Sequence, residues 1–551
     1  MVKPSRFTAD LAREYLTRGY WEYTTVPQLW DECARRYPDR EALCDSRVRL
    51  TWAQAKTGID RLALGLLEMG LKRDQVIAIQ LPNCVELLLA RVACEKAGVM
   101  ALTVIRNLRH KEISHALGLT GAAGVIIPWR HEGRDYFQMI QELKPELPAL
   151  RHILVVDDEA PPGAVSLRDM LEQPLESKYP PDYLEATQIP PDEVGGLSHT
   201  SGSTGLPKIV EDATFPRVAT GRSQYARMGW SPDDVIGVIA PAVGGAAKTI
   251  SFLGAAMAGA RLVLMEQFDA EEALKLIERE RVTIACTVPA QISMMVDHPN
   301  LDKYDLSSLR LVTAATAPLM KEVALKGEER LGAVIVNLYG GMDVGGLCVT
   351  SPGDTQEVRL STIGKPLRGA EFSLRDEQGH DAPPGEVGTI WVRGPILSSG
   401  YFNNPQATRE GWTDGWFNMG DLARYDEGGN VMLVGRSKDV IIRGGHNIYP
   451  VEMENLLSAH PKVQEVAVVA MPDPVLGERA CAYVVPRPGE ALAFEEMISF
   501  LKEKQIASYK FPERLELVTE LPMAAEQKVD KKTLRDDIAR KLEAESGPVT
   551  A

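Results

Sequence analysis

The sequence lacks the features that mark secreted, membrane-spanning or nucleic-acid-binding proteins. Its seven cysteines, among 551 residues, include no CxxC pair, which argues against a disulfide framework or a zinc site and fits a reducing compartment. No apolar run is long enough to span a bilayer, and the opening MVKPSRFTADLAREY lacks the apolar centre of a signal peptide. No basic block interrupts a chain of net charge −15, so broad nucleic-acid contact is not expected. We therefore expect a cytoplasmic protein without a membrane span; the sequence leaves its oligomeric state, including a homodimer, open.

The hydrophobic pattern predicts an α/β fold. Short apolar runs alternate with stretches of helical periodicity, which is typical of parallel sheets covered by helices on both faces. We expect strands at 76–81, 124–127, 153–156, 235–240, 262–265, 282–288 and 334–338, and helices at 26–37, 85–97 and 136–143. Residues 161–191, rich in proline and charge, are expected to form a surface excursion.

The residue composition changes after Gly353. Dense glycine, proline and turn dipeptides predict a smaller antiparallel β region. A compact α+β section follows, with strands expected at 463–470 and 480–485 and helices at 494–504 and from about Lys531. The sequence therefore predicts a large N-terminal domain, 1–437, and a small C-terminal domain, 438–551.

The stretch HTSGSTGLPK, residues 199–208, has the composition of a phosphate-binding loop. Glycines without Cβ atoms allow close approach, and backbone N–H groups, hydroxyls and a lysine can all donate to phosphate oxygens. Leu206 and Pro207 separate Gly205 from Lys208, so the spacing is not that of a P-loop, which has Gly-Lys followed at once by Ser or Thr. The alternative is a flexible surface linker, which would need neither the Pro-Lys pair nor the apolar context.

Five later segments carry further candidate site residues. Tyr339-Gly340 ends a predicted strand, where active sites of parallel sheets lie, and Asp343 follows closely. The others are GWFNMGDL, ending near Asp421, GRSKD at 435–439, RGGHNIYPVE at 443–452, and LPMAAEQKVDKK at 521–532. Viewed singly, each has an ordinary explanation, such as a solvated turn, a hairpin or a lysine-rich surface.

Together and in this order, the segments resemble the adenylate-forming superfamily: acyl- and aryl-CoA ligases, aryl acid-AMP ligases, peptide-synthetase adenylation domains and luciferases. The resemblance runs from Tyr20-Trp21 to Lys532 and is strongest toward the dihydroxybenzoate- and salicylate-activating ligases and related aryl-CoA ligases. It implies use of ATP, Mg²⁺ and coenzyme A.

The resemblance also implies roles for individual residues. Lys528, Lys208 and Thr204 would be catalytic, with Lys528 bridging the acyl carboxylate and the α-phosphate. Asp343 and Thr204 would hold Mg²⁺, Lys438, Gly444 and Gly445 would line the path of CoA, and Asp439 would be the hinge of a mobile small domain. The implied ATP-binding residues are Thr200, Ser201, Gly202, Ser203, Thr204, Gly205, Lys208, Ala315, Leu338, Tyr339, Gly340, Asp421, Arg436 and Lys528.

Three positions depart from the family pattern. Met342 stands where the family has threonine, Asp343 where it has glutamate, and Gln527 where it has glycine. Aspartate keeps the oxygen ligand that Mg²⁺ prefers but is one methylene shorter. Gln527 makes its loop stiffer yet leaves the ammonium of Lys528 available.

A fourth departure concerns the acid pocket, to which the resemblance assigns Ala242, Val243, Gly244, Gly245, Gly340 and Gly345. The dihydroxybenzoate ligases have Pro-Ala-x-His-Asn where this chain has Pro241-Ala242-Val243-Gly244-Gly245, and their asparagine faces the ortho-hydroxyl of the substrate. We therefore predict that no ortho-hydroxyl is required, and that the vacated volume admits a wider acid such as a naphthoate. The alternative is that neighbouring side chains refill the space.

The sequence thus predicts ATP-dependent activation of an aromatic carboxylic acid to an acyl adenylate, followed by thioester formation with CoA. The nearest alternative is an aryl acid-AMP ligase that loads a phosphopantetheinyl carrier protein. From another class, a catalytically silent adenylate-binding scaffold is an alternative that gains some support from the departures at Met342, Asp343 and Gln527. A P-loop NTPase coupled to motion is disfavoured by the missing Gly-Lys-Ser/Thr.

Overall fold

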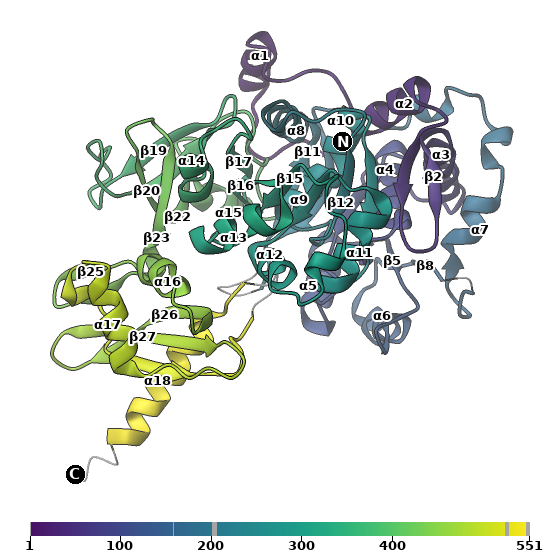
Figure 1. Cartoon of the computed structure of the whole chain (residues 1–551). Coiled ribbons are helices and arrows are strands. Elements are labelled where there is room, and N and C mark those ends of the chain that lie inside the picture. The colour runs from purple at the N-terminus through teal and green to yellow at the C-terminus, as the bar shows by residue number, and fades with distance from the viewer. Residues whose placement is uncertain (1, 158, 201–205, 524–527, 547–551) are drawn as a thin grey trace.

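Two large sheets form the body of the molecule (Figure 1). The structure is a computed structural model, and it describes residues 2–157, 159–200, 206–523 and 528–546. Among the described residues, the strands of the first sheet lie in the order β11-β10-β4-β3-β5-β8-β9. Neighbouring strands are parallel, except for the antiparallel pair β10–β11. Its strands are β3 (Val76–Ile79), β4 (Met100–Thr103), β5 (Gly124–Ile127), β8 (His152–Val155), β9 (Val165–Ser166), β10 (Val194–His199) and β11 (Ile209–Ala213).

The second sheet has the described order β18-β17-β16-β15-β14-β12-β13-β1-β2. Strands β1, β13, β12, β14, β15 and β16 run parallel, so their carboxyl ends meet at one edge. The strands are β1 (Glu41–Cys44), β2 (Arg49–Thr51), β12 (Val235–Val238), β13 (Arg261–Leu264), β14 (Ile284–Thr287), β15 (Leu311–Ala314), β16 (Val334–Gly341), β17 (Gly345–Val349) and β18 (Lys365–Pro366).

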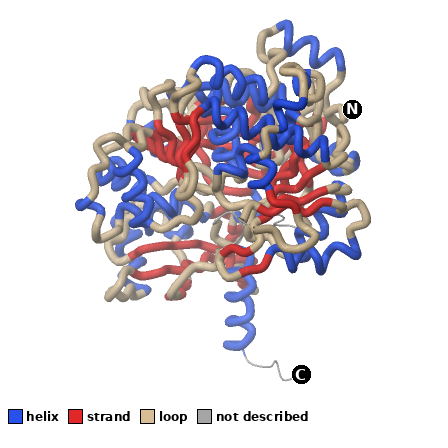
Figure 2. Tube along the Cα trace, turned by 90° about the vertical axis from the view of Figure 1, so that its right-hand side faces the viewer, coloured by secondary structure: helices blue, strands red, loops and turns tan. Residues whose placement is uncertain are grey.

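Helices cover the outer faces of both sheets. Residues of α5 (His110–Thr120) and α6 (Tyr136–Leu143) join one outer core with the first sheet, and those of α11 (Ala270–Glu280), α12 (Pro289–Val296) and α13 (Lys321–Leu331) join another with the second sheet. Figure 2 shows the strands enclosed by helices in a view turned by 90°. No described helix combines the length and the apolar character needed to cross a membrane.

The helix α4 (Val85–Lys96) lies deep in the main core, and all of its residues are buried. It packs on β3 and β4 and against α2 (Val26–Arg36), α3 (Trp52–Glu68) and the π-helical turn η4 (Ile250–Gly254). A fully enclosed helix normally carries apolar residues all round, yet α4 contains Arg91 and Glu95, and these form a buried ion pair. This pair belongs to a charge cluster that reaches the candidate site.

A third, antiparallel sheet follows, with β19 (Glu371–Arg375), β20 (Gly388–Arg393), β21 (Trp412–Thr413), β22 (Trp416–Tyr425) and β23 (Val431–Arg436). The short helix α14 (Gln356–Ser361) precedes it and α15 (Pro405–Gly411) lies before β21. The change in composition after Gly353 therefore correctly predicted an antiparallel β region.

The small C-terminal domain lies at the lower left of Figure 1. Its sheet has the order β25-β24-β27-β26, with β28 beside β27. Its elements are β24 (Ile441–Arg443), β25 (His446–Ile448), α16 (Pro450–Ser458), β26 (Val463–Asp473), β27 (Gly477–Pro486), α17 (Phe494–Glu503), β28 (Arg514–Leu517) and α18 (Lys531–Ser546). The expected fold class, a large helix-covered α/β domain with a β region plus a small α+β domain, is confirmed.

The joint between the two domains is a short turn, η6 (Ser437–Asp439), which lies between β23 and β24. Ser437 Oγ donates to the Gly420 carbonyl at 2.9 Å, and Arg535 Nη1 donates to Asp439 Oδ1 at 2.9 Å. Asp439 is thus anchored to α18 of the small domain. The boundary at 437/438 and the hinge role of Asp439 remain predictions.

Candidate active site

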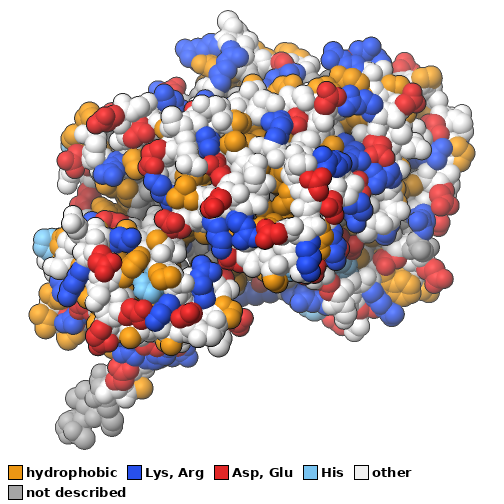
Figure 3. Space-filling view, in the orientation of Figure 1, with side chains coloured by type: hydrophobic (Ala, Val, Ile, Leu, Met, Phe, Trp, Pro, Cys, Tyr) orange, Lys and Arg blue, Asp and Glu red, His pale blue; other side chains and the backbone are white. Residues whose placement is uncertain are grey.

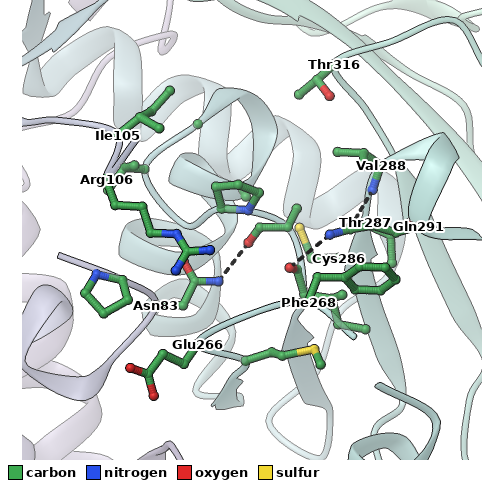
Figure 4. A pocket seen from close by; sticks show the side chains of 18 of the residues that line it. Asn83, Ile105, Arg106, Glu266, Phe268, Cys286, Thr287, Val288, Gln291 and Thr316 are labelled. Atoms are coloured by element: carbon green, nitrogen blue, oxygen red, sulfur yellow. Dashed lines mark hydrogen bonds between the residues drawn. The ribbon is translucent and has the colours of Figure 1, made fainter. Parts of the chain in front are cut away.

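Two cavities lie where the parallel strands of the second sheet end. The first has a volume of about 310 Å³ and lies beyond β12, β13 and β14. Figure 4 shows Asn83, Arg106, Phe268 and Gln291 around it, with the Asn83 amide donating to the Ala240 carbonyl at 2.9 Å. The second, of about 100 Å³, lies beside β16 and β17. Ala315 and Thr316 line both, so the cavities adjoin at the end of β15.

The second cavity brings together several predicted residues from distant parts of the chain. Its lining includes Ala315, Leu338, Tyr339, Gly340, Gly345, Gly245 and Lys528. Lys528 comes from the small domain, whereas the others belong to the large one. The structure thus places the lysine of the C-terminal segment in a cavity lined by predicted nucleotide- and acid-binding residues.

The predicted acid pocket is divided between the two cavities. Val243 and Gly244 line the first cavity, whereas Gly245, Gly340 and Gly345 line the second. Ala242 is fully buried and lines neither; its N–H donates to Asn83 Oδ1 at 2.8 Å.

The space beside Gly245 is filled by a neighbouring side chain, whereas the space beside Gly244 is open. A Cβ placed on Gly245 would approach Thr316 Cγ2 to 2.8 Å, whereas one on Gly244 would meet only the Pro241 carbonyl oxygen, at 3.6 Å. A neighbour therefore fills the space at Gly245, and the space at Gly244 stays open to the first cavity.

The glycine-rich loop is held at both ends. Antiparallel pairing of β10 and β11 sets His199 opposite Ile209, and the Lys208 N–H donates to Thr200 Oγ1 at 3.1 Å. The Lys208 ammonium lies 4.6 Å from the ring centre of Tyr401. Ser201, Gly202, Ser203, Thr204 and Gly205 lie outside the described residues, so only Thr200 and Lys208 of the predicted phosphate contacts are placed.

Asp343, the predicted metal ligand, is linked to Lys208 through Tyr401. The Tyr401 hydroxyl donates to Asp343 Oδ1, and Lys208 contacts the other part of the same tyrosine, its ring. Burial and the Asp343 charge raise the pKa of Tyr401, which keeps this hydroxyl a donor. The described residues contain no cluster of three or more metal-binding side chains; a single carboxylate fits Mg²⁺, which is usually held by one or two carboxylates plus substrate phosphates and water.

Tyr339, Asp421 and Arg436 form a connected set. The Tyr339 hydroxyl donates to Asp421 Oδ2 at 2.6 Å, and Arg436 Nε donates to Asp421 Oδ1 at 2.7 Å. Burial, followed by the Asp421 charge, raises the pKa of Tyr339 well above its usual value. A carboxylate has about four acceptor positions, so Asp421 retains capacity for further donors such as ribose hydroxyls.

The pantetheine residues predicted from the resemblance lie elsewhere. Gly444 and Gly445 form the turn of the β24–β25 hairpin, and both are exposed, as is Lys438. None of the three lines either cavity. In this arrangement of the domains, the small domain presents Lys528 to the second cavity and keeps the glycine hairpin away from it.

Sequence reasoning missed several cavity residues. Thr316 has a left-handed backbone, with φ of 75°, and its Oγ1 is buried without a hydrogen-bond partner among the described residues; such strain is common at functional sites. Asp212, Gln224 and Lys248 also line the second cavity. Asp212 could have been noticed in the sequence, because an aspartate is unusual in the buried strand 209–213. Gln224 and Lys248 lie in helical sequence that gives no such indication.

We expect Gly340→Ala to close the second cavity. A Cβ at this position would lie 2.2 Å from the Gly345 carbonyl oxygen and 2.9 Å from Gly346 Cα, so β17 must move. Acid-dependent ATP–pyrophosphate exchange should fall by about 10-fold or more, since small misplacements at reacting centres are costly. Gly118→Ala, in α5 with its nearest contact at 3.8 Å, is the matched control and should exchange normally; equal rates for both variants would contradict this prediction.

Comparison with known proteins agrees with this geometry. The AMP-binding enzyme model matches residues 30–402, and the AMP-binding enzyme C-terminal domain model matches residues 452–528. The chain belongs to the AMP-binding enzyme family, and the resemblance seen in the sequence is confirmed.

Relatives of known name cover nearly the whole chain. It is similar to the 2,3-dihydroxybenzoate-AMP ligase of Bacillus subtilis (strain 168), with 31% identity over 97% of each chain. It is similar to the 2-hydroxy-7-methoxy-5-methyl-1-naphthoate–CoA ligase of Streptomyces carzinostaticus, with 32% identity over 97% of each chain. Among solved structures, the anthranilate CoA ligase AuaEII in complex with anthranoyl-AMP has a TM-score of 0.86 and 25% identity over 95% of this chain and 98% of that one.

Proposed function

We propose that this protein activates an aromatic carboxylic acid with ATP and passes the acyl group to the thiol of coenzyme A. The observation that carries the proposal is the second cavity, where Lys528 of the small domain meets Ala315, Tyr339 and Gly340 of the large domain. Such a joint site is what acyl-adenylate chemistry needs, because two anionic reactants must be brought together.

The reaction has two steps. First, a carboxylate oxygen of the acid attacks the α-phosphorus of ATP, and the bond to pyrophosphate breaks. Then the thiol sulfur attacks the acyl carbon, AMP leaves with the electron pair of the broken C–O bond, and the thiol proton goes to solvent. The first step replaces a charged, unreactive carboxylate oxygen by a phosphate leaving group.

The described residues support distinct tasks in this scheme. The ammonium of Lys528 would offset charge on the acid and the α-phosphate, Lys208 would contact the β- and γ-phosphates, and Asp421 would accept from the ribose. Tyr339, fixed by its bond to Asp421, would stack on the adenine. Mg²⁺, held by Asp343, would neutralise phosphate charge when bound.

The thiol route follows from the shared wall of the cavities. Because Ala315 and Thr316 border both, the first cavity offers a path by which a thiol arm can approach an acyl group in the second. Rotation at Asp439 would then withdraw Lys528 and bring Gly444-Gly445 to this path. The seven free cysteines of the described residues favour the cytoplasm as the site of this reaction.

The acid is proposed to be an aryl acid that needs no ortho-hydroxyl, including bicyclic acids such as naphthoates. The similarity to a naphthoate–CoA ligase supports a bicyclic acid, and the glycines at 244 and 245, in place of a His-Asn pair, support the dispensable ortho-hydroxyl. The similarity to a dihydroxybenzoate-AMP ligase supports the second candidate, loading of a phosphopantetheinyl carrier protein. The set of connected site residues disfavours a silent scaffold.

The test is ATP–pyrophosphate exchange with a panel of benzoic, salicylic, 2,3-dihydroxybenzoic and naphthoic acids. We expect exchange that depends on an added acid and does not require the ortho-hydroxyl. Strong preference for 2,3-dihydroxybenzoate would contradict the pocket assignment, and acid-independent behaviour would support the scaffold. Thioester formation with free CoA, compared with a phosphopantetheinyl carrier protein, separates the two ligase types.

A further inference from the structure

One wall of the second cavity is polar. Asp212 on β11, Thr220 and Gln224 on α8 (Thr214–Met228), and Lys248 on α9 (Gly245–Thr249) line it. Resting on the function proposed above, we infer that this wall selects an acid bearing a hydroxyl group remote from its activated carboxylate, with Gln224 and Lys248 as its recognition residues.

Gln224 has an unmet hydrogen-bonding capacity at this wall. Its side chain is only 2% exposed, and its Oε1 has no partner among the described residues. A buried amide oxygen without a donor is unfavourable, and buried polar atoms of native proteins are rarely left so. The adjacent strand makes room for this amide, because a Cβ on Gly346 would lie 2.4 Å from Gln224 Nε2. Gln224 lines the cavity, so a small rotation of its side chain would let a hydroxyl there donate to Oε1.

Lys248 supplies the complementary donor. Its Nζ lies 2.8 Å from Asp212 Oδ2 and 3.2 Å from Ser198 Oγ. These contacts use two of the three N–H groups of an ammonium. The third is suited to a hydroxyl oxygen in the cavity that Lys248 lines.

The charged side chains behind the polar wall also favour a ligand atom that accepts hydrogen bonds. Arg217 donates to both oxygens of Glu95 at 3.0 Å, and Arg91 pairs with the same carboxylate. Three cations, the buried Arg91 and the half-buried Arg217 and Lys248, therefore face two buried carboxylates, Asp212 and Glu95. The cluster carries one excess positive charge in a low-dielectric setting, where electron-rich ligand atoms are attracted more strongly than in water.

The polar wall and Lys528 approach the cavity from different parts of the molecule. Lys528 belongs to the segment that precedes α18 of the small domain, whereas the polar wall is formed by β11, α8 and α9 of the large domain. An acid whose carboxylate meets Lys528 therefore directs the far part of its ring system toward α8 and β11. The recognised hydroxyl is consequently at a ring position away from the carboxylate, not at the ortho position.

The first experiment compares matched acids in ATP–pyrophosphate exchange: benzoate with 3- and 4-hydroxybenzoate, 2-naphthoate with 6-hydroxy-2-naphthoate, and 4-methylbenzoate as a control for size. We expect the better hydroxylated acid of a pair to exceed its parent in kcat/KM by about 100-fold or more, because buried polar groups left unpaired reject the parent. Equal use of hydroxylated and parent acids would overturn this inference alone. If no acid supports exchange, the proposed function falls and this inference falls with it.

The second experiment tests Gln224 directly. Gln224→Met is of similar volume and removes no described partner of Oε1, so the melting temperature should be unchanged or higher. The preference for the hydroxylated acid should fall by about 10-fold, the order expected for one neutral hydrogen bond. Gln80→Met is the matched control: Gln80 is also buried, but its amide donates to three backbone carbonyls, so it should lower the melting temperature and leave the preference intact.

A paired substitution tests Lys248. Lys248→Met combined with Asp212→Leu removes both charges together, which avoids an isolated buried charge. The preference for the hydroxylated acid should again fall by about 10-fold or more. An unchanged preference in both Gln224→Met and the double variant would overturn the assignment.

Discussion

Substitution Lys528→Ala should slow adenylation by about 10²–10³-fold, the loss typical of removing one preorganised charge-stabilising group. Lys528 lines the cavity that Tyr339 and Gly340 border, so the change removes the small domain's ammonium from the reacting carboxylate and phosphate. Acid-dependent ATP–pyrophosphate exchange measures this step. Lys532→Ala is the matched control, because Lys532 is exposed and pairs with Asp536 on α18, and it should exchange at the wild-type rate.

The same variant should keep its second half-reaction. If the small domain rotates before the thiol attacks, Lys528 has left the cavity by then, and thioester formation from a preformed acyl adenylate should proceed within a few-fold of wild type. Rapid-quench measurement of the thioester checks this. Equal loss of both half-reactions would contradict the rotation and would mean that Lys528 acts throughout in one arrangement.

Substitution Glu95→Gln should strongly destabilise the fold, costing about 3–5 kcal/mol of unfolding free energy. Glu95 is 1% exposed and is the shared partner of Arg91 and Arg217. Removing its charge leaves the buried guanidinium of Arg91 and the half-buried one of Arg217 without their shared carboxylate. Urea unfolding midpoints give the loss, and the exposed pair of Glu14 and Arg18 provides the control Glu14→Gln, expected within about 0.5 kcal/mol of wild type.

The pH dependence of that loss has a defined sign. Burial alone would raise the pKa of Glu95, but Arg217 and Arg91 outweigh it and lower the pKa below its usual value. A carboxyl whose folded pKa is lowered contributes stability that is fully present above its unfolded pKa, near 4.5, and that is lost as the pH falls through the folded pKa. The difference between wild type and Glu95→Gln should therefore be constant above pH ~5 and shrink below it.

The regular elements were largely predictable because their patterns are local. The strand 124–127 and the helix 136–143 coincide with β5 and α6, since a four-residue apolar run and an amphipathic period need no knowledge of the rest of the chain. The strand order could not be read in the same way. β12 lies between β13 and β14 because of how crossover helices pack, which is a property of the assembled sheet.

The site was predictable only as far as its motifs reached. Tyr339, Asp421 and Arg436 were named from their segments, and the structure joins them by hydrogen bonds. Lys248 and Gln224 were not named, because a lysine and a glutamine in helical sequence give no sign that they will be buried at a cavity. Their importance comes from tertiary neighbours such as Asp212 and Gly346, which only the assembled fold brings near.

The burial of the cysteines has a chemical consequence for an enzyme that makes reactive acyl groups. All seven are buried, and burial raises the pKa of each thiol, with that of Cys286, beside the first cavity, raised to about 12. Since only the thiolate is an effective nucleophile, the chain holds no sulfur able to capture the activated acid for itself. Its own cysteines therefore do not compete with an external thiol for the acyl group.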